Sequence, residues 1–487
     1  MSDTPVTQNS GLRSGVLGLF DSTIMGIAGS APGYSIAATT TALFGAVMYG
    51  GPAALLYCGF FMFGIVFAFK YLSQTDSHAG ASYSWVRRAL HPILGYLAGW
   101  AVVVAGLIFM VIATFPAGSS VLSLFSSSAA SNKNWIVILG SLFFLLMVGA
   151  VAAGVTVTVT VQIVMSCIEV FLLLLFAVIA IFHTHHVVQF SWHWFSPSIF
   201  QQAGPSGFKV FVSGALLAAF YFWGWDVTAN LNEETKNAKK TSGMGGIIGT
   251  ICVFGLFEVF TVASNLVLTP TQLQDSNNAA DILAVLGQTV WHGTGGKLIV
   301  VAVLLSTVAT LETTLIQVTR TLFAMGRDNT LPHKLGSVHP VRKSPLVATL
   351  TVAVISLGLF VGSHYVGSIQ TILTDGYNAI GLQICLYYSL AGLSVVVLYR
   401  RQLFKSVGNF IFMGAWPLLG AIFMAFIFVK VIPGLDNTTL WVGLGSLALG
   451  LIPMAYYWQK GSSYFSPPSK EDRHAADIEI LELQENL

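Results

Sequence analysis

The sequence predicts an all-α membrane protein, and three observations support this prediction. Hydrophobic residues make up 55% of the 487 residues, whereas charged residues make up only 9%. A soluble domain carries about 25% charged residues, so a chain this poor in charge needs lipid as its solvent. The third observation is a succession of apolar runs of about 20 residues, the length that crosses the hydrocarbon core as a helix.

Twelve apolar runs predict twelve transmembrane helices, and the first run is too long for one straight helix. They lie near 17–48, 52–73, 93–125, 135–154, 159–182, 208–231, 243–268, 297–325, 346–364, 370–398, 407–431 and 439–458. We therefore expect a cytoplasmic N-terminus (1–16), five helices within 17–182, five within 208–398, two within 407–458, and a solvated cytoplasmic tail (459–487).

The positions of Lys and Arg support this count and give an orientation. With both termini in the cytoplasm, eighteen of the 22 Lys and Arg residues lie in cytoplasmic segments, and four lie outside: Lys133, Lys209, Lys297 and Lys430. Such asymmetry is typical of membrane proteins. The polar start has no cleavage site, so we expect the first run to remain as a helix of a cell (inner) membrane protein.

Composition also limits the partners and cofactors. The net charge of +2 gives no sign of a nucleic-acid partner. All four cysteines lie inside apolar runs, which indicates core or lipid-facing residues rather than a disulfide or metal framework; they are Cys58, Cys167, Cys252 and Cys385. The loop after the fifth run holds four histidines beside Trp192 and Trp194, and we interpret it as an aromatic interface belt. These histidines are His183, His185, His186 and His193. We expect no metal and no cofactor.

The first run contains a break signal, because three Gly and one Pro fall within residues 26–33. Pro32 has no amide proton and disfavours helix at Ala31, so a new half-helix should begin at Pro32. The amides from Ser30 to Tyr34 would then be free, at the positive end of a helix dipole, where a carboxylate binds. A simple kink is the alternative. We favour a binding site, because unpaired backbone in a bilayer is tolerated only where it is buried or lines a cavity.

The sixth run contains the second break signal, the sequence FYFWGWD at 220–226. Carbonyls freed near Gly224 are able to hold an ammonium group, with the aromatic rings as the walls of the pocket. Asp226 has two interpretations. It N-caps the second half-helix, or it pairs with an ammonium group or carries a proton. The two breaks occupy matching positions in two five-helix halves, which is the pattern of an inverted-repeat transporter with its substrate site at the membrane midplane.

Several motifs in order carry a family resemblance. They are the break at 26–33, HAGASYSWV at 78–86, GYLAGW at 95–100, FWGWD at 222–226, EETKN at 233–237 and AMGRD at 324–328. From about Leu17 to Arg401 the chain resembles the amino acid–polyamine–organocation superfamily of permeases. The resemblance implies a five-plus-five inverted repeat of the LeuT type, two additional C-terminal helices, and alternating access.

The resemblance also implies a substrate site between the interrupted first and sixth helices. There the substrate carboxylate meets backbone amides of the first helix, and its amine meets backbone carbonyls of the sixth. Carried over to this sequence, the first set is Ala28, Gly29, Ser30 and Ala31, and the second is Phe222, Trp223 and Gly224. Gly33 and Asp226 complete the candidate set.

The fifth run departs from the family pattern. Several members place a Lys seven residues after a Gln, whereas here Gln162 is followed at that spacing by Glu169. Glu169 shares a helix stripe with Gln162 and Ser166. An acid at membrane depth is costly and usually functional, so we hypothesise that Glu169 carries the coupling proton. The alternative is a neutral acid that is hydrogen-bonded between helices.

Other acids inside the runs rank lower. Glu312 is a further proton-coupling candidate, with packing and internal pairing as the favoured interpretation. Glu258 and Asp375 are second-rank. Asp21 is expected at the cytoplasmic end of the first helix, where we pair it with Arg320.

The sequence therefore predicts a proton-coupled secondary transporter of amino acids, a monomer or homodimer in the lipid bilayer. An amine or polyamine carrier and an amino acid exchanger are alternatives within the same class. A metal-ion carrier is disfavoured because Ala31, not Asp, precedes Pro32 and no Met lies at 220–226. A channel is disfavoured because the sequence shows no selectivity ring. An enzyme is disfavoured because the sequence shows no catalytic motif. A nutrient receptor with a transporter fold stays open.

Overall fold

The computed structural model describes residues 11–126, 130, 132–275 and 282–466, and these residues form helices almost throughout. The only extended pairing among them is a single β-bridge between Leu17 and Thr235. Ten helical stretches are long and apolar enough to cross a membrane, and one of these, Leu19–Thr75, contains three α-helices. The prediction of an all-α membrane protein is confirmed, whereas the count of twelve helices and the repeat stay predictions.

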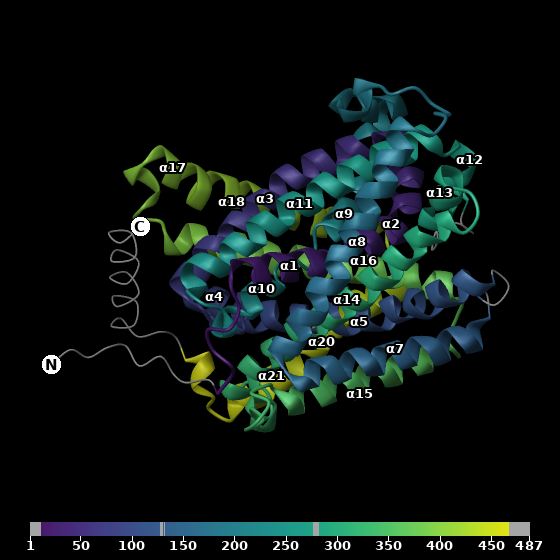
Figure 1. Cartoon of the computed structure of the whole chain (residues 1–487). Helices are drawn as coiled ribbons and strands as arrows, with labels where there is room; N and C mark the ends of the chain where they lie inside the picture. Colours follow the sequence, from purple (N-terminus) through teal and green to yellow (C-terminus); the bar gives the residue numbers. More distant parts are fainter. Residues whose placement is uncertain (1–10, 127–129, 131, 276–281, 467–487) are drawn as a thin grey trace.

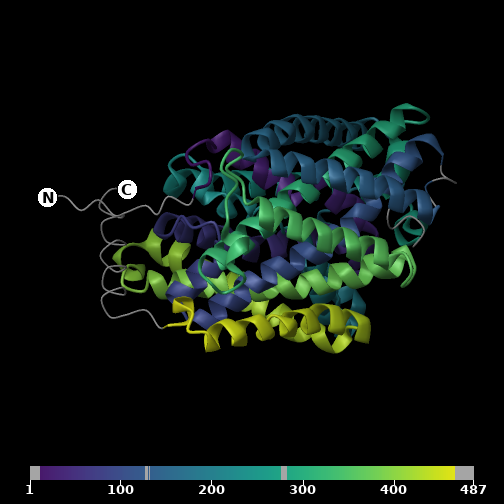
Figure 2. The same ribbon diagram turned by 90° about the horizontal axis from the view of Figure 1, so that it is seen from below.

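The long helices pack against one another, and the connections between them include long segments such as 183–206 and 328–345 (Figures 1 and 2). In chain order they are α3 (Gly51–Thr75), α5 (Pro92–Phe125), α7 (Lys133–Ala153), α8 (Val155–Phe182), α11 (Ala238–Val267), α14 (Leu298–Arg327), α15 (Leu346–Ser363) and α16 (Ile369–Leu398). The last two apolar stretches, Val407–Gly434 and Asn437–Gln459, each contain a π-helical segment, at Phe410–Ala415 and Trp441–Gly445. These bounds agree with the predicted runs to within a few residues.

Four shorter helices come from the two interrupted runs. The first run forms α1 (Leu19–Ser30) and α2 (Pro32–Val47), and the sixth forms α9 (Gly207–Tyr221) and α10 (Val227–Asn230). Both predicted breaks are confirmed. Helices α3, α8, α11, α14 and α16 pack around these four, and Phe109 of α5 contacts Tyr34 and Phe220, so the interrupted segments lie in the interior.

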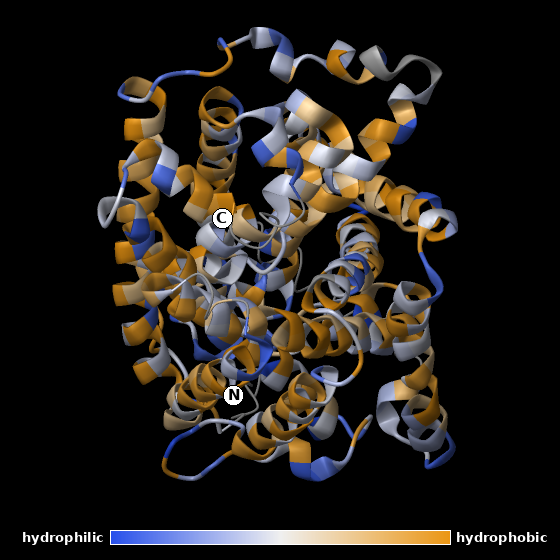
Figure 3. Ribbon diagram, turned by 90° about the vertical axis from the view of Figure 1, so that its right-hand side faces the viewer, coloured by the Kyte–Doolittle hydropathy of each residue, from blue (hydrophilic) through white to orange (hydrophobic). Residues whose placement is uncertain are grey.

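Helices α7 and α15 lie side by side at the margin of the molecule (Figure 1). Their outward faces expose large apolar residues, among them Leu142 and Leu146 of α7 and Val354 and Leu359 of α15. Figure 3 shows hydrophobic residues along the outer helices of the molecule. Such an apolar surface is stable in lipid and would be unstable in water.

Three short helices were not predicted from the apolar runs, because they are too short or too polar to cross a membrane. They are α4 (Ser82–Ala89), α12 (Pro270–Gln274) and α13 (Ile282–Val290). The predicted solvated tail is also corrected in part. Tyr464 and Phe465 are buried, and the Tyr464 hydroxyl donates a hydrogen bond to the Tyr83 carbonyl at 3.0 Å. The rest of that tail, and most of the predicted N-terminal segment, lie outside the described residues.

Candidate functional site

The first break is a single residue in the left-handed conformation. Ala31 has φ 47° and ψ 66°, and it separates α1 from α2. Pro32 then occupies the first position of α2, where its missing amide proton costs no helical hydrogen bond. The carbonyls before the break are held by hydroxyl groups. Thr310 donates to the Gly29 carbonyl at 3.1 Å, and Ser35 donates to the Ser30 carbonyl at 2.9 Å.

The first amides of α2 are not free, which corrects the prediction for this segment. The Gly33 amide donates to Oε1 of Glu169 at 2.9 Å, and the Tyr34 amide donates to the Ser306 hydroxyl at 3.0 Å. The Ala31 amide donates within α1, to the Ile27 carbonyl. Because a helix N-terminus attracts a carboxylate, the acid of α8 takes the place that was predicted for an external anion.

The second break is centred on Gly224, whose φ of +94° is a conformation that glycine adopts without strain. Asp226 follows in the turn before α10, but its side chain makes no capping hydrogen bond. The N-cap interpretation of Asp226 is therefore wrong. Its Oδ2 atom instead accepts hydrogen bonds from Gln317 of α14 at 2.8 Å and from the Tyr387 hydroxyl of α16 at 2.9 Å.

The two breaks touch each other through their glycines. A Cβ atom added to Gly29 would lie 2.2 Å from the Gly224 carbonyl oxygen, and one added to Gly224 would lie 2.2 Å from the Gly29 carbonyl oxygen. Neither position has space for a side chain. The structure thus brings Gly29 and Gly224, one predicted residue from each break, into direct backbone contact.

Aromatic side chains cover this contact on the side formed by α2, α5 and the start of α16. The Tyr34 and Tyr377 hydroxyl oxygens lie 3.1 Å apart. The Phe109 ring packs edge-on against Tyr34 and Trp223, with ring centroids 5.5 and 5.2 Å apart, and Phe220 packs on Tyr377 at 5.0 Å. We refer to these five residues as the aromatic lid. The Phe222 ring does not join it, because it packs against Phe254 and Phe257 of α11.

A polar cluster lies beneath Trp223. Its indole nitrogen donates to the Tyr387 hydroxyl at 2.7 Å, which in turn donates to Asp226. Asp226 is 1% exposed, and its second oxygen, Oδ1, has no hydrogen-bond partner. A buried carboxylate oxygen without a donor is costly, and it is chemically suited to a ligand that brings N–H groups.

Glu169 and Glu312 lie on facing helices, α8 and α14. Glu169 is fully buried and bonds to Gly33, as described above. Glu312 is 1% exposed, and its Oε2 atom accepts a hydrogen bond from Gln162 of α8 at 2.5 Å. Glu312 therefore has the internal pairing that we favoured. The hydrogen bond between helices that was proposed as the alternative for Glu169 is also present, from the Gly33 amide of α2.

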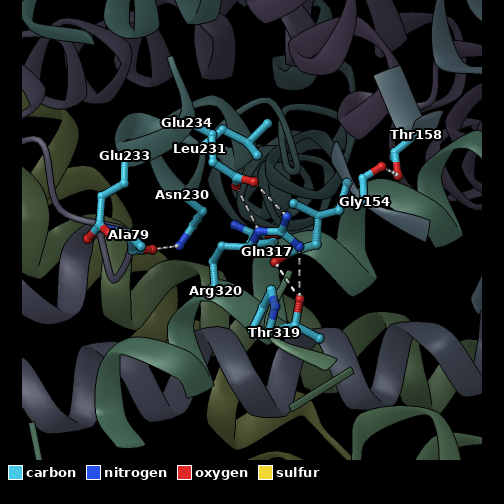
Figure 4. Close-up of polar contacts among 12 residues, drawn as sticks. Ala79, Gly154, Thr158, Asn230, Leu231, Glu233, Glu234, Gln317, Thr319 and Arg320 are labelled. Carbon is cyan, nitrogen blue, oxygen red and sulfur yellow. Dashed lines mark hydrogen bonds and ion pairs between the residues drawn. The ribbon is translucent and has the colours of Figure 1, made fainter. Parts of the chain in front are cut away.

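On the side of the breaks opposite the aromatic lid, ion pairs are formed by the C-terminal part of α14. Arg320 bonds through Nε and Nη2 to both oxygens of Glu234, at 3.0 and 3.1 Å, and both side chains are 1% exposed. Figure 4 shows Arg320 directed at Glu234 and, beside them, Asn230 directed at Ala79. The predicted Asp21–Arg320 pair is wrong, because Asp21 accepts a hydrogen bond from the Gly18 amide at the start of α1.

A second ion pair lies close by and is less buried. Arg327 bonds to both oxygens of Glu233, at 2.9 and 3.1 Å, and its Nη2 lies 2.6 Å from Nε2 of His78. Burial alone would raise the pKa of Glu233, but His78, Arg327 and the Ala79 amide together hold it below its ordinary value.

The remaining predicted residues take no part in this site. Glu258 of α11 is largely buried, with no hydrogen-bond partner for either carboxyl oxygen. Asp375 of α16 is half-buried near Asp436. Within the part of the chain that the structure describes, no three His, Cys, Asp or Glu side chains are grouped so that they could hold a metal ion. Cys58 and Cys385 are buried, whereas Cys167 and Cys252 are exposed on the apolar surface.

Sequence reasoning missed most of the partners that α14 and α16 supply. One signal was available, because α14 carries polar residues at helical spacing along one stripe: Ser306, Thr310, Thr313, Gln317 and Thr321. All five are buried. A buried polar stripe on an apolar helix faces other polar groups rather than lipid. No comparable pattern identified Phe109 or Tyr387.

Known proteins match most of the chain in sequence. Residues 17–452 match the family model described as amino acid permease. The methylthioribose transporter of Bacillus subtilis is 24% identical over 88% of this chain and 92% of its own length. The low-affinity putrescine importer PlaP of Escherichia coli is 24% identical over 77% and 79%. The branched-chain amino acid permease BcaP of Lactococcus lactis is 24% identical over 65% and 70%.

These relatives are transporters, and the match covers the apolar helices, both breaks and the ion pairs of α14. The chain is therefore an integral membrane transporter of small molecules rather than an enzyme, and it belongs to the amino acid permease family.

Proposed function

We propose that this protein is a proton-coupled secondary transporter of amino acids that works by alternating access. The substrate binds between the two breaks, at residues 28–31 and 33 on one side and 222–224 and 226 on the other. Twelve helices in a five-plus-five inverted repeat with two added helices form the carrier, and both termini are cytoplasmic. The paired breaks in the first and sixth runs and the Lys and Arg distribution support this arrangement.

One observation carries the proton coupling, and it is the hydrogen bond from the Gly33 amide to Glu169. A substrate carboxylate that binds the start of α2 competes with Glu169 for this amide. Once displaced, the Glu169 carboxylate has lost its donor in a fully buried position, so it takes up a proton. Substrate and proton then bind together, and they leave together when Glu169 regains the amide.

Closure on both sides of the breaks fits an occluded state of this cycle. The aromatic lid covers the breaks toward the outer side of the proposed orientation, and Arg320–Glu234 covers them toward the cytoplasm. Alternate opening of the two closures exposes the site to one side at a time. Gly29 and Gly224 separate when the substrate enters, because their backbones leave no space between them.

An amine carrier is the second candidate, and the unpartnered Oδ1 atom of Asp226 favours it. An ammonium group bound to this oxygen would lie close to Trp223. An amine substrate could therefore bind without a carboxylate of its own at the start of α2. The relatives span this range, since their names give an amine, branched-chain amino acids and methylthioribose as substrates. Amino acid exchange without net proton movement is a variant of the first proposal.

Transport by the purified protein in liposomes tests the proposal. Counterflow is measured for amino acids, for their decarboxylated amines and for methylthioribose, and uptake is then measured with and without an inward proton gradient in sodium-free buffer. We expect an amino acid to give counterflow and to accumulate only with the gradient. Binding without flux, or accumulation that requires sodium, would contradict the proposal.

Two matched variants separate the roles of the buried acids. Glu169→Gln keeps an oxygen for the Gly33 amide but cannot carry a proton, so gradient-driven accumulation should be lost while counterflow falls much less. Asp226→Asn removes the negative charge beside Trp223, so it should lower counterflow of amines more than that of amino acids. Full accumulation by Glu169→Gln would exclude Glu169 as the proton carrier.

A further inference from the structure

The face of α8 that is directed at the protein interior carries a polar stripe that extends beyond Glu169. Thr158, Gln162, Ser166 and Glu169 follow one another at spacings of four, four and three residues, so they share one face of the helix. All four are 0% exposed. The opposite face of α8 is lined by exposed apolar residues such as Val164 and Phe171, which face lipid.

Helix α14 packs against this stripe with polar groups of its own. Gln162 donates both to the Ala309 carbonyl at 2.9 Å and to Glu312 at 2.5 Å. Closer to the breaks, Ser306 and Thr310 of α14 bond to backbone atoms of α2 and α1. The contact between α8 and α14 is thus a polar seam, from Gly33 at the break to Gln162 and Glu312.

Four oxygen atoms in this seam have no hydrogen-bond partner. They are Glu169 Oε2, Ser166 Oγ, Gln162 Oε1 and Glu312 Oε1. Burial of an unpaired polar atom is costly, and natural proteins hold few such atoms. The polar seam holds four such oxygen atoms and has a carboxyl group at either end. Packing alone would not favour this arrangement. The arrangement is chemically suited to the transfer of a proton from one oxygen atom to another.

The seam continues toward the surface at the start of α8. Thr158 donates to the carbonyl of Gly154, the residue before α8, and Figure 4 shows the two residues directed at each other. Thr156 and Val157 beside it are exposed. With a rise of 1.5 Å per residue, Glu169 lies about 10 Å from Gln162 along α8, which is too far for direct transfer of a proton. Ser166 lies between the two.

We propose that this seam is the path by which the coupling proton leaves Glu169 for the cytoplasm, with Glu312 as a second proton station. This inference rests on the proposed proton coupling. After side-chain rotation brings them within hydrogen-bonding distance, Glu169 gives its proton to the Ser166 hydroxyl oxygen, and the hydroxyl then passes a proton on to the Glu312 carboxylate in the same way. Glu169 ends as a carboxylate, Glu312 as an acid, and Ser166 is unchanged. Glu312 then releases the proton to the cytoplasm. Gln162 is a positioning residue that holds the Glu312 side chain in the seam.

The path is separate from the route of the substrate. Substrate passes between the breaks, where Gly29 meets Gly224, and the inner closure there is the pair of Arg320 and Glu234. The proton passes instead between α8 and α14. Glu312 bonds to Gln162 and not to either member of that ion pair. The proton can therefore leave without passing the buried guanidinium group.

Three variants test the path in liposomes in sodium-free buffer, with a pH-sensitive dye inside. Glu312→Gln and Ser166→Ala are compared with wild-type protein by the ratio of gradient-driven uptake to counterflow, since counterflow needs no net proton release. We expect this ratio to fall at least about tenfold in both variants, with a matching loss of proton entry. Glu258→Gln is the control, because Glu258 is also a poorly paired acid inside a helix but makes no hydrogen bond to the seam. Its ratio should equal that of wild type.

Ser166→Ala keeps the test decisive if Glu312→Gln does not fold. The Ser166 hydroxyl has no partner, so its removal costs no hydrogen bond and should leave the melting temperature unchanged or raised. Wild-type ratios in both Ser166→Ala and Glu312→Gln would overturn the path, while a loss in Glu169→Gln would still support proton coupling. If Glu169→Gln also matches wild type, the proposed coupling itself fails. Restored uptake with added sodium would identify the seam as a cation site instead.

Discussion

The Oε1 atom of Glu169 lies 2.9 Å from the amide nitrogen of Gly33, so a side chain of α8 occupies the N-terminus of α2. These residues are 136 positions apart in the sequence. The bond links the one acid that departs from the family pattern to the break where a substrate carboxylate is expected. In the proposed function, the proton carrier and the substrate carboxylate therefore compete for this one hydrogen-bond donor.

This bond predicts how stability responds to replacement of Glu169. Glu169→Leu leaves the Gly33 amide buried without an acceptor, which should cost about 1–3 kcal/mol. Glu169→Gln retains an acceptor oxygen and should cost less. Melting temperatures of the purified variants measure the difference. A leucine variant as stable as the glutamine variant would show that the Gly33 amide finds another acceptor.

Gly224→Ala should destabilise the protein and abolish transport. Gly224 has φ +94°, and an added Cβ atom would lie 2.2 Å from the Gly29 carbonyl oxygen. The backbone strain alone is about 1–3 kcal/mol, and the steric overlap adds to it. Gly255→Ala in α11 is the control, because no atom lies within 4 Å of its added Cβ. Melting temperature and counterflow should both separate the two variants, and equal values would contradict the contact.

The breaks could be predicted from sequence because their causes are local. Pro32 lacks an amide proton and Gly224 adopts a positive φ, and both properties belong to the residue itself. The predicted start of the second half-helix at Pro32 is therefore correct to the residue. The lengths of the long helices were predictable for a similar reason, since the thickness of the hydrocarbon core determines them.

The partners of the buried charges could not be predicted, because they depend on tertiary packing. Asp226 stands in the position of an N-cap, yet its side chain turns away from its own helix to Gln317 and Tyr387. Arg320 is close to the predicted inner end of its helix, and Asp21 was its predicted partner. Only the packing of α10 against α14 selects Glu234.

Breaking the buried pair of Arg320 and Glu234 should strongly destabilise the protein. In Glu234→Gln the guanidinium group stays buried without a counter-charge, at a cost of about 3–5 kcal/mol. The double variant Arg320→Met with Glu234→Gln should recover part of this loss, because no buried charge remains. Lys405→Met, at an exposed position, is the control. Melting temperatures test the set. A double variant that is less stable than both single variants would contradict the explanation.

Glu233 should make stability depend on pH in the acid range. Its pKa in the folded protein lies below the ordinary value of 4.5, so its ion pair with Arg327 contributes fully above that pH. The contribution is lost as the pH falls through the lowered pKa, because the folded protein must then take up a proton. The melting temperature of wild type should exceed that of Glu233→Gln near pH 6, and the two should converge below pH 4.5. A constant difference would show that Glu233 acts through packing alone.

Tyr387→Phe should be more harmful than the same change at its neighbour. The Tyr387 hydroxyl accepts a hydrogen bond from the Trp223 indole at 2.7 Å and donates one to Asp226 at 2.9 Å. Its removal leaves a buried indole N–H unpaired and takes one donor from the carboxylate, at a cost of about 1–3 kcal/mol.

Tyr388→Phe is the matched comparison, because the Tyr388 side chain is equally buried but the Trp223 indole donates to Tyr387 and not to Tyr388. We therefore expect a lower melting temperature and weaker substrate affinity in Tyr387→Phe and smaller changes in Tyr388→Phe. If Trp223 and Asp226 form the wall of the substrate site, the loss of affinity in Tyr387→Phe should exceed its loss of counterflow rate at saturating substrate. Equal effects of the two changes would mean that aromatic packing, and not the chain of hydrogen bonds from Trp223 to Asp226, shapes this side of the site.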